Sequence, residues 1–171
     1  QKQKYLPQMA SGQIISAFAL TEPSSGSDAA SLKTTAIKDG SHYVLNGTKR
    51  YITNAPEAGI FTVMARSNPD ISGAAGISAF IVERDSPGLT IGRTDKKMGQ
   101  QGTHTADVIF DECRVPVENR IGDEGEGFKT AMKVLDRGRL RIAGMSVGAA
   151  DRLIEECISY AKERVQFNKP I

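Results

Sequence analysis

The sequence predicts an α+β fold: an antiparallel β-barrel or sandwich domain followed by two α-helices of an incomplete helical bundle. From residue 13 to about 121 the chain consists of short apolar segments separated by turn residues. Beyond that point apolar residues recur with helical spacing, and no glycine occurs after Gly148. Strands do not alternate with helices, which argues against a parallel sheet built from βαβ units.

The β part is expected to contain about seven or eight short strands with hairpin-length connections. Its first strand, within residues 14–20, leads into a loop over residues 21–28 that contains a proline, a glycine and three serines. The pairs Asp39-Gly40 and Asn46-Gly47 predict hairpin turns, because these residues tolerate positive φ. Further strands are predicted at residues 31–38, 43–45, 48–53, 60–65, 77–82, 89–91 and 106–110.

Two helices are predicted in the last third of the chain. Apolar residues between 128 and 135 follow the i, i+3, i+4, i+7 rule, and Gly138 is expected to interrupt that helix. A longer helix is predicted from about residue 139 to 166, and its first half is apolar on several sides. Such a helix needs neighbours around it. We therefore expect part of a bundle whose other helices are missing or come from other subunits.

Composition excludes several classes of protein. The chain has 22 Lys and Arg against 20 Asp and Glu, a net charge of +2 with no long basic block, which argues against nucleic acid as the main partner. No apolar run is long enough for a membrane span, and the N-terminus lacks a signal peptide, so a cytoplasmic protein is expected. Cys113 and Cys157 fit neither a disulfide framework nor a zinc finger. His42 and His104 lack neighbours with metal-ligand spacing, so no metal site is predicted.

Two segments have a possible functional interpretation. The loop over residues 21–28 directly follows a predicted strand and contains Gly26 and several hydroxyl side chains, so its backbone N–H groups could bind a phosphate. Most loops of this composition are plain loops, which is the alternative interpretation. The polar run 136–141 is either a solvated hinge with local ion pairs or a cluster that faces a bound anion. Asn46-Gly47-Thr48 is formally a glycosylation sequon, but a hairpin turn explains it better.

An ordered set of segments over essentially the whole chain resembles the acyl-CoA dehydrogenase family. These segments are residues 4–7, 18–23 with 26–28, 46–54, 97–100, 108–111, 114–116, 125–128 and 163–167. The resemblance implies a helical N-terminal domain, a middle β-barrel and a C-terminal four-helix bundle that assembles tetramers. It assigns residues 1–12 to the tail of the first, 13–121 to the flavin- and acyl-CoA-contacting second, and 122–171 to the truncated start of the third.

The same resemblance implies residues that bind FAD and substrate. Phe18, Leu20 and Thr21 would contact the flavin ring, and Gly26 and Ser27 would border the flavin and the thioester. The opposite side would be covered by Tyr51, where many relatives have Trp, by Ile52, and by Thr53 near flavin N5. The FAD pyrophosphate or adenosine of a neighbouring subunit would be reached by Arg164, Gln166 and Phe167. Substrate contacts would come from Ser27, Leu135, Asp136 and Arg139.

The implied reaction is FAD-dependent α,β-dehydrogenation of an acyl-CoA thioester, with a carboxylate as general base and hydride transfer to flavin N5. No catalytic base is expected in the chain itself: the usual glutamate would lie beyond Ile171, and the position used by a minority branch lies close to Gly138. The resemblance also implies an electron-transfer flavoprotein as acceptor, a homotetramer, and a mitochondrial matrix location in a eukaryote. Alternatives are a flavin-dependent oxidase or hydroxylase of the same superfamily, or a non-catalytic β-domain used for binding or assembly.

Overall fold

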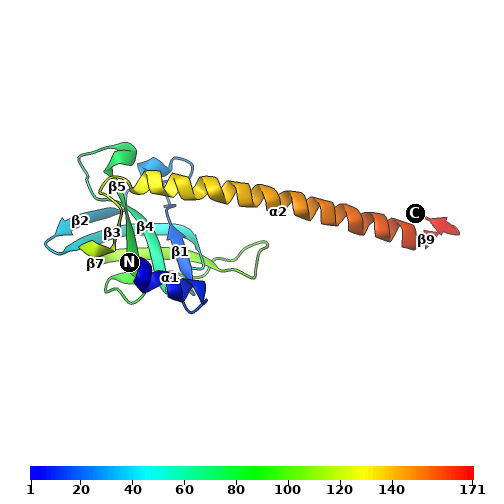
Figure 1. The fold of residues 1–171 in the computed structure, drawn as a ribbon, viewed down its shortest axis with the longest axis horizontal. Helices are drawn as coiled ribbons and strands as arrows, with labels where there is room; N and C mark the ends of the chain where they lie inside the picture. Colours follow the sequence, from blue (N-terminus) through cyan, green and yellow to red (C-terminus); the bar gives the residue numbers. More distant parts are fainter. The chain divides into compact units, whose positions relative to one another are not determined.

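The computed structural model describes residues 1–171, which form two units, Gln1–Ala131 and Met132–Ile171 (Figure 1). The first unit is built on one eight-stranded sheet. Its strands are β1 (Ser16–Ala19), β2 (Thr35–Asp39), β3 (His42–Thr53), β4 (Ile60–Arg66), β5 (Ile77–Glu83), β6 (Leu89–Ile91), β7 (Thr105–Pro116) and β8 (Arg120–Ile121).

The sheet is mixed and open, which corrects the predicted antiparallel barrel or sandwich. The strand order is β6-β7-β3-β2-β4-β5-β8, so β6 and β8 are free ends, and β1 pairs with β4 beside this path. The β1–β4 pairing is parallel, as is the single-residue contact between β2 and β4, whereas the other pairs are antiparallel. Hairpin signals describe only strands that follow one another in the chain. The pairing of β1 with β4 is long-range and left no such signal.

Short helices complete the first unit. Helix α1 (Lys2–Ala10) places Tyr5 in a buried position, and three single turns of 3-10 helix connect the strands. These turns are η1 (Ala29–Ser31), η2 (Gly73–Gly76) and η3 (Val117–Asn119). The segment before β5, which begins and ends with a glycine, therefore forms η2 rather than an irregular loop.

One predicted hairpin is confirmed and one is wrong. Asp39 pairs with His42, so β2 and β3 are joined by a tight turn in which Gly40 has φ +58°. Asn46-Gly47 instead lies inside β3, at a register irregularity opposite β7. A Cβ on Gly47 would lie 2.5 Å from Thr34 Oγ1, so the glycine is needed for the close approach of Thr34, the residue before β2, rather than for a turn.

The core of the first unit lies between residues 17 and 115 and is built from alternate residues of the strands. Tyr43 on β3 and Phe80 on β5 meet edge to face, with ring centroids 4.8 Å apart. Each large apolar side chain buried in this way contributes about 1.5–3 kcal/mol to folding. Cys113 also lies in this core, and burial raises the pKa of its thiol to about 11.

Helix α2 (Gly127–Glu163) is continuous, which corrects the predicted break at Gly138. A glycine inside a helix costs about 1 kcal/mol relative to alanine, which is too little to end a helix of 37 residues. Of its residues, those from Met132 onward belong to the second unit, and Cys157 there is exposed. No helix of the chain is both long enough and apolar enough to cross a membrane.

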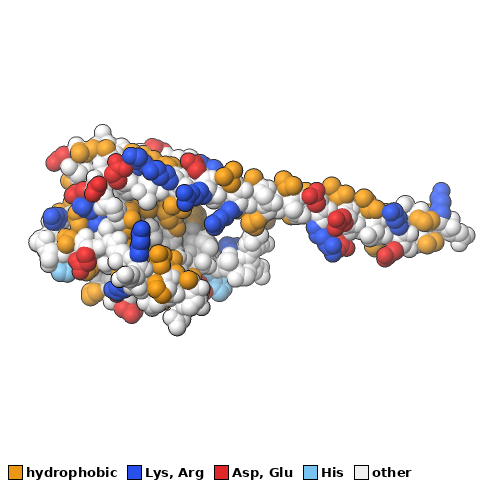
Figure 2. All heavy atoms as spheres, viewed as in Figure 1, with side chains coloured by type: hydrophobic (Ala, Val, Ile, Leu, Met, Phe, Trp, Pro, Cys, Tyr) orange, Lys and Arg blue, Asp and Glu red, His pale blue; other side chains and the backbone are white.

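Many apolar side chains of α2 are exposed within the second unit, and Figure 2 shows hydrophobic atoms along the whole helix. They are Val134, Leu140, Ile142, Met145, Val147, Leu153, Ile154 and Ile158. A small antiparallel hairpin follows, with β9 (Val165–Gln166) paired to β10 (Lys169–Pro170). Both residues of its turn, Phe167 and Asn168, have positive φ, as a type I′ turn requires.

Candidate functional site

The ends of β1 and β3 lie side by side and bring together two of the predicted flavin-contacting segments. The backbone N–H of Arg50 donates to the carbonyl of Thr21 at 2.8 Å. One residue earlier on each segment, Lys49 Nζ donates to the carbonyl of Leu20 at 3.1 Å. These contacts between residues 20–21 and 49–50 bring the segments 18–21 and 51–53 together, although they are far apart in sequence. This junction of the two segments is called the joined edge of β1 and β3.

Tyr51 occupies a strained, outward-facing position at this edge. The register between β3 and β7 shifts between Lys49 and Ile52, and Tyr51 within this bulge has φ +57°. The residue is 59% exposed. The Arg50 guanidinium lies 4.8 Å from the ring centroid and donates to Asp107 Oδ2 at 3.1 Å. A cation held over the ring restricts the position of this aromatic side chain.

The predicted side chains at this edge differ in what they can offer a ligand. Phe18 and Thr21 are half-buried, and Thr53 is exposed, so their side chains are accessible. Leu20 and Ile52 are buried in the core of the unit. These two residues can reach a ligand only through their backbone groups.

The loop after β1 is ordered by its own hydrogen bonds. Glu22 and Ser25 exchange two backbone hydrogen bonds, and Ser25 Oγ donates to the carbonyl of Asp28 at 2.6 Å. Gly26 and Ser27 are exposed at its tip. A Cβ on Gly26 would meet no atom within 4 Å, so the fold of this chain does not itself require glycine there.

A buried ion pair between Lys49 and Glu22, which no sequence motif indicated, lies next to these contacts. Lys49 Nζ is 2.7 Å from Glu22 Oε1, and the two side chains are 0% and 4% exposed. Glu22 also accepts the backbone N–H groups of Lys33, at 2.6 Å, and Thr34, at 2.9 Å. The pair therefore links the loop after β1, the residues just before β2, and β3.

Burial sets the protonation behaviour of this pair. Desolvation lowers the pKa of Lys49 to about 8, although the neighbouring carboxylate acts in the opposite direction. Burial raises the pKa of Glu22, but the Lys49 charge and the hydrogen bonds from Lys49, Thr34 and Lys33 outweigh it and bring the pKa below its ordinary value. Glu22 is thus a buried, ionised and fully bonded carboxylate, which makes it a poor general base.

A signal for Lys49 was present in the sequence. Side chains of a strand alternate between its two faces, and Tyr43 and Leu45 of β3 point into the core. The same alternation places Lys49 on the inner face, where a lysine requires a buried partner. Because a hairpin was predicted at Asn46-Gly47, this strand was divided into two, and the alternation of inward-facing residues did not extend to Lys49.

The remaining predicted residues lie in the second unit. Arg139 donates to Asp136 Oδ1 at 2.7 Å, one turn apart on α2, and Leu135 precedes them on the same helix. Arg164 Nη1 donates to the hydroxyl of Tyr160 at 3.1 Å, and Gln166 begins the exposed turn that Phe167 continues. Both arginines are exposed, and within the unit each is held by one neighbouring side chain.

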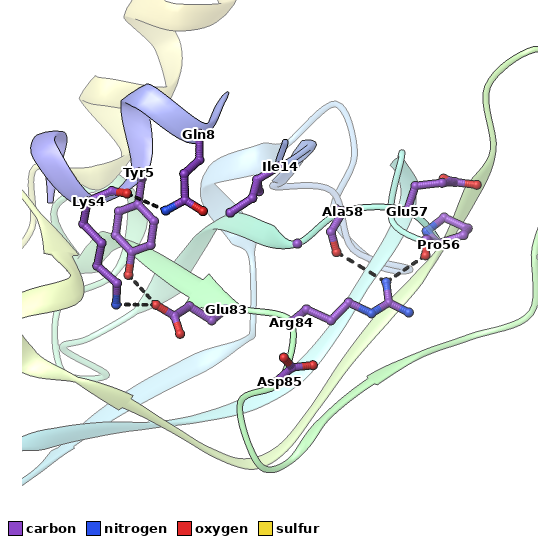
Figure 3. A pocket seen from close by; sticks show the side chains of 11 residues that line it. Lys4, Tyr5, Gln8, Ile14, Pro56, Glu57, Ala58, Glu83, Arg84 and Asp85 are labelled. Atoms are coloured by element: carbon purple, nitrogen blue, oxygen red, sulfur yellow. Dashed lines mark hydrogen bonds and ion pairs between the residues drawn. The ribbon is translucent and has the colours of Figure 1, made fainter. Parts of the chain in front are cut away.

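A pocket of about 510 Å³ lies between α1 and the loops before β4 and after β5 (Figure 3). Tyr5 donates its hydroxyl to Glu83 at 2.8 Å, and Lys4 forms an ion pair with the same carboxylate at 2.5 Å. Opposite, Arg84 Nη1 donates to the carbonyls of Pro56, at 2.8 Å, and Ala55, at 3.0 Å. None of the predicted site residues lines this pocket, so it is distinct from the edge formed by β1 and β3.

Two family models match the chain in sequence order. The model described as "Acyl-CoA dehydrogenase, middle domain" matches residues 17–113, and the model described as "Acyl-CoA dehydrogenase, C-terminal domain" matches residues 125–171. The chain belongs to the acyl-CoA dehydrogenase family. The edge formed by β1 and β3 lies within the first match, and all of α2 from its first turn lies within the second.

Individual relatives agree with the family models. The "Acyl-CoA dehydrogenase" of Bacillus subtilis is 51% identical over 171 residues, which are 100% of this chain and 45% of that protein. A protein of Acetobacterium woodii named "Caffeyl-CoA reductase-Etf complex subunit CarC" is 46% identical over the whole chain and 45% of its own length. The chain thus spans less than half the length of these curated relatives.

Solved structures share the fold. Butyryl-CoA dehydrogenase from Megasphaera elsdenii matches with a TM-score of 0.93 and 42% identity, over 99% of this chain and 44% of that one. A structure of "PigA with FAD and proline" matches with a TM-score of 0.94 and 37% identity, over 99% of this chain and 44% of that one. The mixed sheet and the two helices α1 and α2 therefore form an acyl-CoA dehydrogenase fold.

Proposed function

We propose that this chain forms the flavin- and acyl-CoA-contacting part of an enzyme that removes hydrogen from the α and β carbons of acyl-CoA thioesters with FAD as cofactor. The observation that supports it best is the joined edge of β1 and β3. An exposed aromatic ring, Tyr51, lies there beside a tight loop, and accessible hydroxyls come from Thr21 and Thr53. A flat heteroaromatic group with polar edges needs this combination of a ring face and hydrogen-bond donors.

FAD in such a site supplies the acceptor for the hydride that leaves the β-carbon. Phe18 and Tyr51 would flank the ring and exclude water, and Thr21 and Thr53 would orient its polar edge through their hydroxyls. The backbone of Leu20 and Ile52 would contribute hydrogen bonds, because their side chains are buried. Gly26 and Ser27, at the exposed loop tip, would lie toward the thioester.

Residues of the second unit would complete the binding of cofactor and substrate. Arg164, Gln166 and Phe167 would contact the pyrophosphate and adenosine of FAD in a neighbouring subunit, for which an arginine provides a fixed fork of donors. Leu135, Asp136 and Arg139 would border the acyl-CoA. A homotetramer would present these groups to one another, and the exposed apolar side chains of α2 support such an assembly.

The catalytic base is proposed to lie outside this chain. Glu22 is linked to the joined edge through its contact with Lys49, and it is buried and already bonded to three donors. It cannot accept an α-proton without losing its ion pair. An electron-transfer flavoprotein is the proposed electron acceptor, and the name of the Acetobacterium relative supports this choice. The cytoplasm, or the mitochondrial matrix in a eukaryote, is the proposed compartment.

The test is anaerobic titration with butyryl-CoA of the purified full-length protein, which includes the base proposed to lie outside residues 1–171. We expect a bound yellow chromophore identified as FAD, bleaching of its visible absorbance by the acyl-CoA, and formation of the enoyl-CoA product.

In the assembled protein, Arg164→Ala should release FAD at least about tenfold more readily without changing the far-UV circular dichroism, because a charge-assisted pair with the pyrophosphate is lost. A protein that binds no flavin contradicts the proposal and supports a non-catalytic binding or assembly role.

A second candidate is a flavin-dependent oxidase or hydroxylase of the same superfamily. The similarity to the PigA structure, which is described with FAD and proline, favours keeping it. Measurement of hydrogen peroxide under air separates the two: an oxidase forms peroxide in step with substrate, whereas a dehydrogenase requires an added electron acceptor.

A further inference from the structure

The ion pair between Lys49 and Glu22 is buried, whereas another Lys–Glu pair of the same unit is on the surface. Lys4 and Glu83 are 2.5 Å apart, but their side chains are 61% and 45% exposed. Lys49 and Glu22 are 0% and 4% exposed. Nothing in the proposed reaction uses the buried pair directly, because neither charged group reaches the surface of the site.

Stability alone does not explain a buried ion pair. Removing two charges from water costs several kcal/mol for each ion, and well-packed apolar residues in their place are often neutral or stabilising. An apolar pair, however, cannot hold a carbonyl group in a fixed direction. The contacts of Lys49 and Glu22 are therefore informative about what the pair does.

The pair holds one particular peptide. Lys49 Nζ binds the carbonyl of Leu20, and the next carbonyl, that of Thr21, is bound by the backbone N–H of Arg50. The chain has no cis peptide bond, and in a planar trans peptide the C=O and N–H groups point in opposite directions. Because the Leu20 carbonyl points to the buried ammonium, the Thr21 N–H points away from the buried pair.

The carboxylate in turn fixes the ammonium. Glu22 accepts hydrogen bonds from Lys49 and from the backbone N–H groups of Thr34 and Lys33. Its position is therefore set by the residues just before β2 as well as by β3. These hydrogen bonds, together with that from Lys49 to Leu20, leave the Leu20–Thr21 peptide little freedom to rotate. A preorganised donor needs this kind of support from the residues behind it.

We propose that Lys49 and Glu22 are positioning residues that orient the Thr21 backbone N–H toward the flavin ring. The inference rests on the proposed function, since it assigns a role within the same site. The pair contacts neither cofactor nor substrate and acts only through the Leu20–Thr21 peptide.

The test compares two double variants of the purified holoprotein, Glu22→Gln with Lys49→Met and the surface control Glu83→Gln with Lys4→Met. Three quantities are measured: FAD affinity by fluorescence titration, the absorption spectrum of the bound flavin, and its midpoint potential. The buried variant should bind FAD at least about tenfold more weakly, the cost of one misdirected hydrogen bond, and shift both the spectrum and the potential. The control should match the wild type in all three.

The outcomes are distinguishable. A folded buried variant with wild-type affinity, spectrum and potential overturns the positioning role. If that variant does not fold, Glu22→Leu with Lys49→Met, which leaves neither side chain with an unpaired polar group, is measured in the same way. A wild-type protein that binds no FAD overturns the proposed function and this inference with it.

Discussion

At Tyr51 the backbone takes a conformation that aromatic residues rarely adopt. Positive φ outside glycine costs about 1–3 kcal/mol and persists only where the surroundings impose it. Here the buried side chains of Lys49 and Ile52 lie on either side of the bulge and fix it. The extra residue turns the Tyr51 ring outward. The strain is thus located at the residue for which a ring-facing role is proposed.

Lys49 should make stability depend on pH in the alkaline range. Burial lowers its pKa from 10.5 to about 8 in the folded chain, whereas the unfolded chain keeps the ordinary value. Between these values the unfolded state binds more protons, so the free energy of unfolding rises with pH, by up to about 1.4 kcal/mol per pH unit. Urea unfolding at several values between about pH 7.5 and 9.5 should show this rise relative to Lys49→Met. Parallel pH profiles for the two proteins would contradict it.

The resemblance to a known family, rather than the residue types alone, assigned Thr21, Tyr51 and Thr53 to the candidate site. The structure brings the segments that contain them together. Their exposure could not be predicted: Leu20 and Ile52 belong to the same motifs, yet their side chains are buried. Which side of a strand a residue faces depends on bulges, and a bulge such as that at Tyr51 shifts the alternation by one residue.

At the scale of elements, three glycines show where a turn or a helix break can be predicted from the local sequence and where it cannot. Asp39-Gly40 forms the predicted turn, but Asn46-Gly47 does not, because Gly47 is required by the approach of Thr34. That contact joins β3 to the residue before β2 and is not visible in the local sequence. Gly138 resembles a helix break in sequence, yet its neighbours in α2 outweigh its low propensity. The two-residue strands β8, β9 and β10 are too short to show any periodicity.

Two alanine substitutions should therefore act in opposite directions. Gly47→Ala places a Cβ within 3 Å of three Thr34 atoms at φ +146° and should destabilise the first unit by at least about 2 kcal/mol. Gly138→Ala meets no atom within 4 Å and should stabilise α2 by about 1 kcal/mol. Chemical denaturation tests the first, and hydrogen exchange of α2 amides tests the second. Equal effects of the two substitutions would rule out this explanation.

At the scale of the whole molecule, the two units differ in how completely they bury apolar surface. The main hydrophobic cluster of the first unit comes from residues 17–115, and Tyr5 and Ala131 are buried as well. The second unit exposes most of its apolar side chains. Sequence periodicity predicted this contrast, since the helix was expected to need neighbours. It did not predict the parallel pairing of β1 with β4, because pairing between distant strands depends on the completed sheet.

Removal of residues 132–171 should leave the first unit folded. Its core residues are all retained, so we expect one cooperative thermal transition within about 5 °C of the corresponding transition in the intact chain, a shift typical of about 1 kcal/mol. Differential scanning calorimetry of both chains measures this. A shortened chain without a cooperative transition would show that the first unit depends on the second.

The unequal burial of the two cysteines has a practical consequence. Thiol reagents react with the thiolate. Cys113 is protected from them by its burial and by its pKa of about 11, whereas Cys157 is exposed on α2. A maleimide dye or nitroxide added to the native chain near neutral pH therefore attaches at one place. Fluorescence or paramagnetic spectroscopy can then follow the helix of the second unit without any engineered substitution in the flavin-contacting unit.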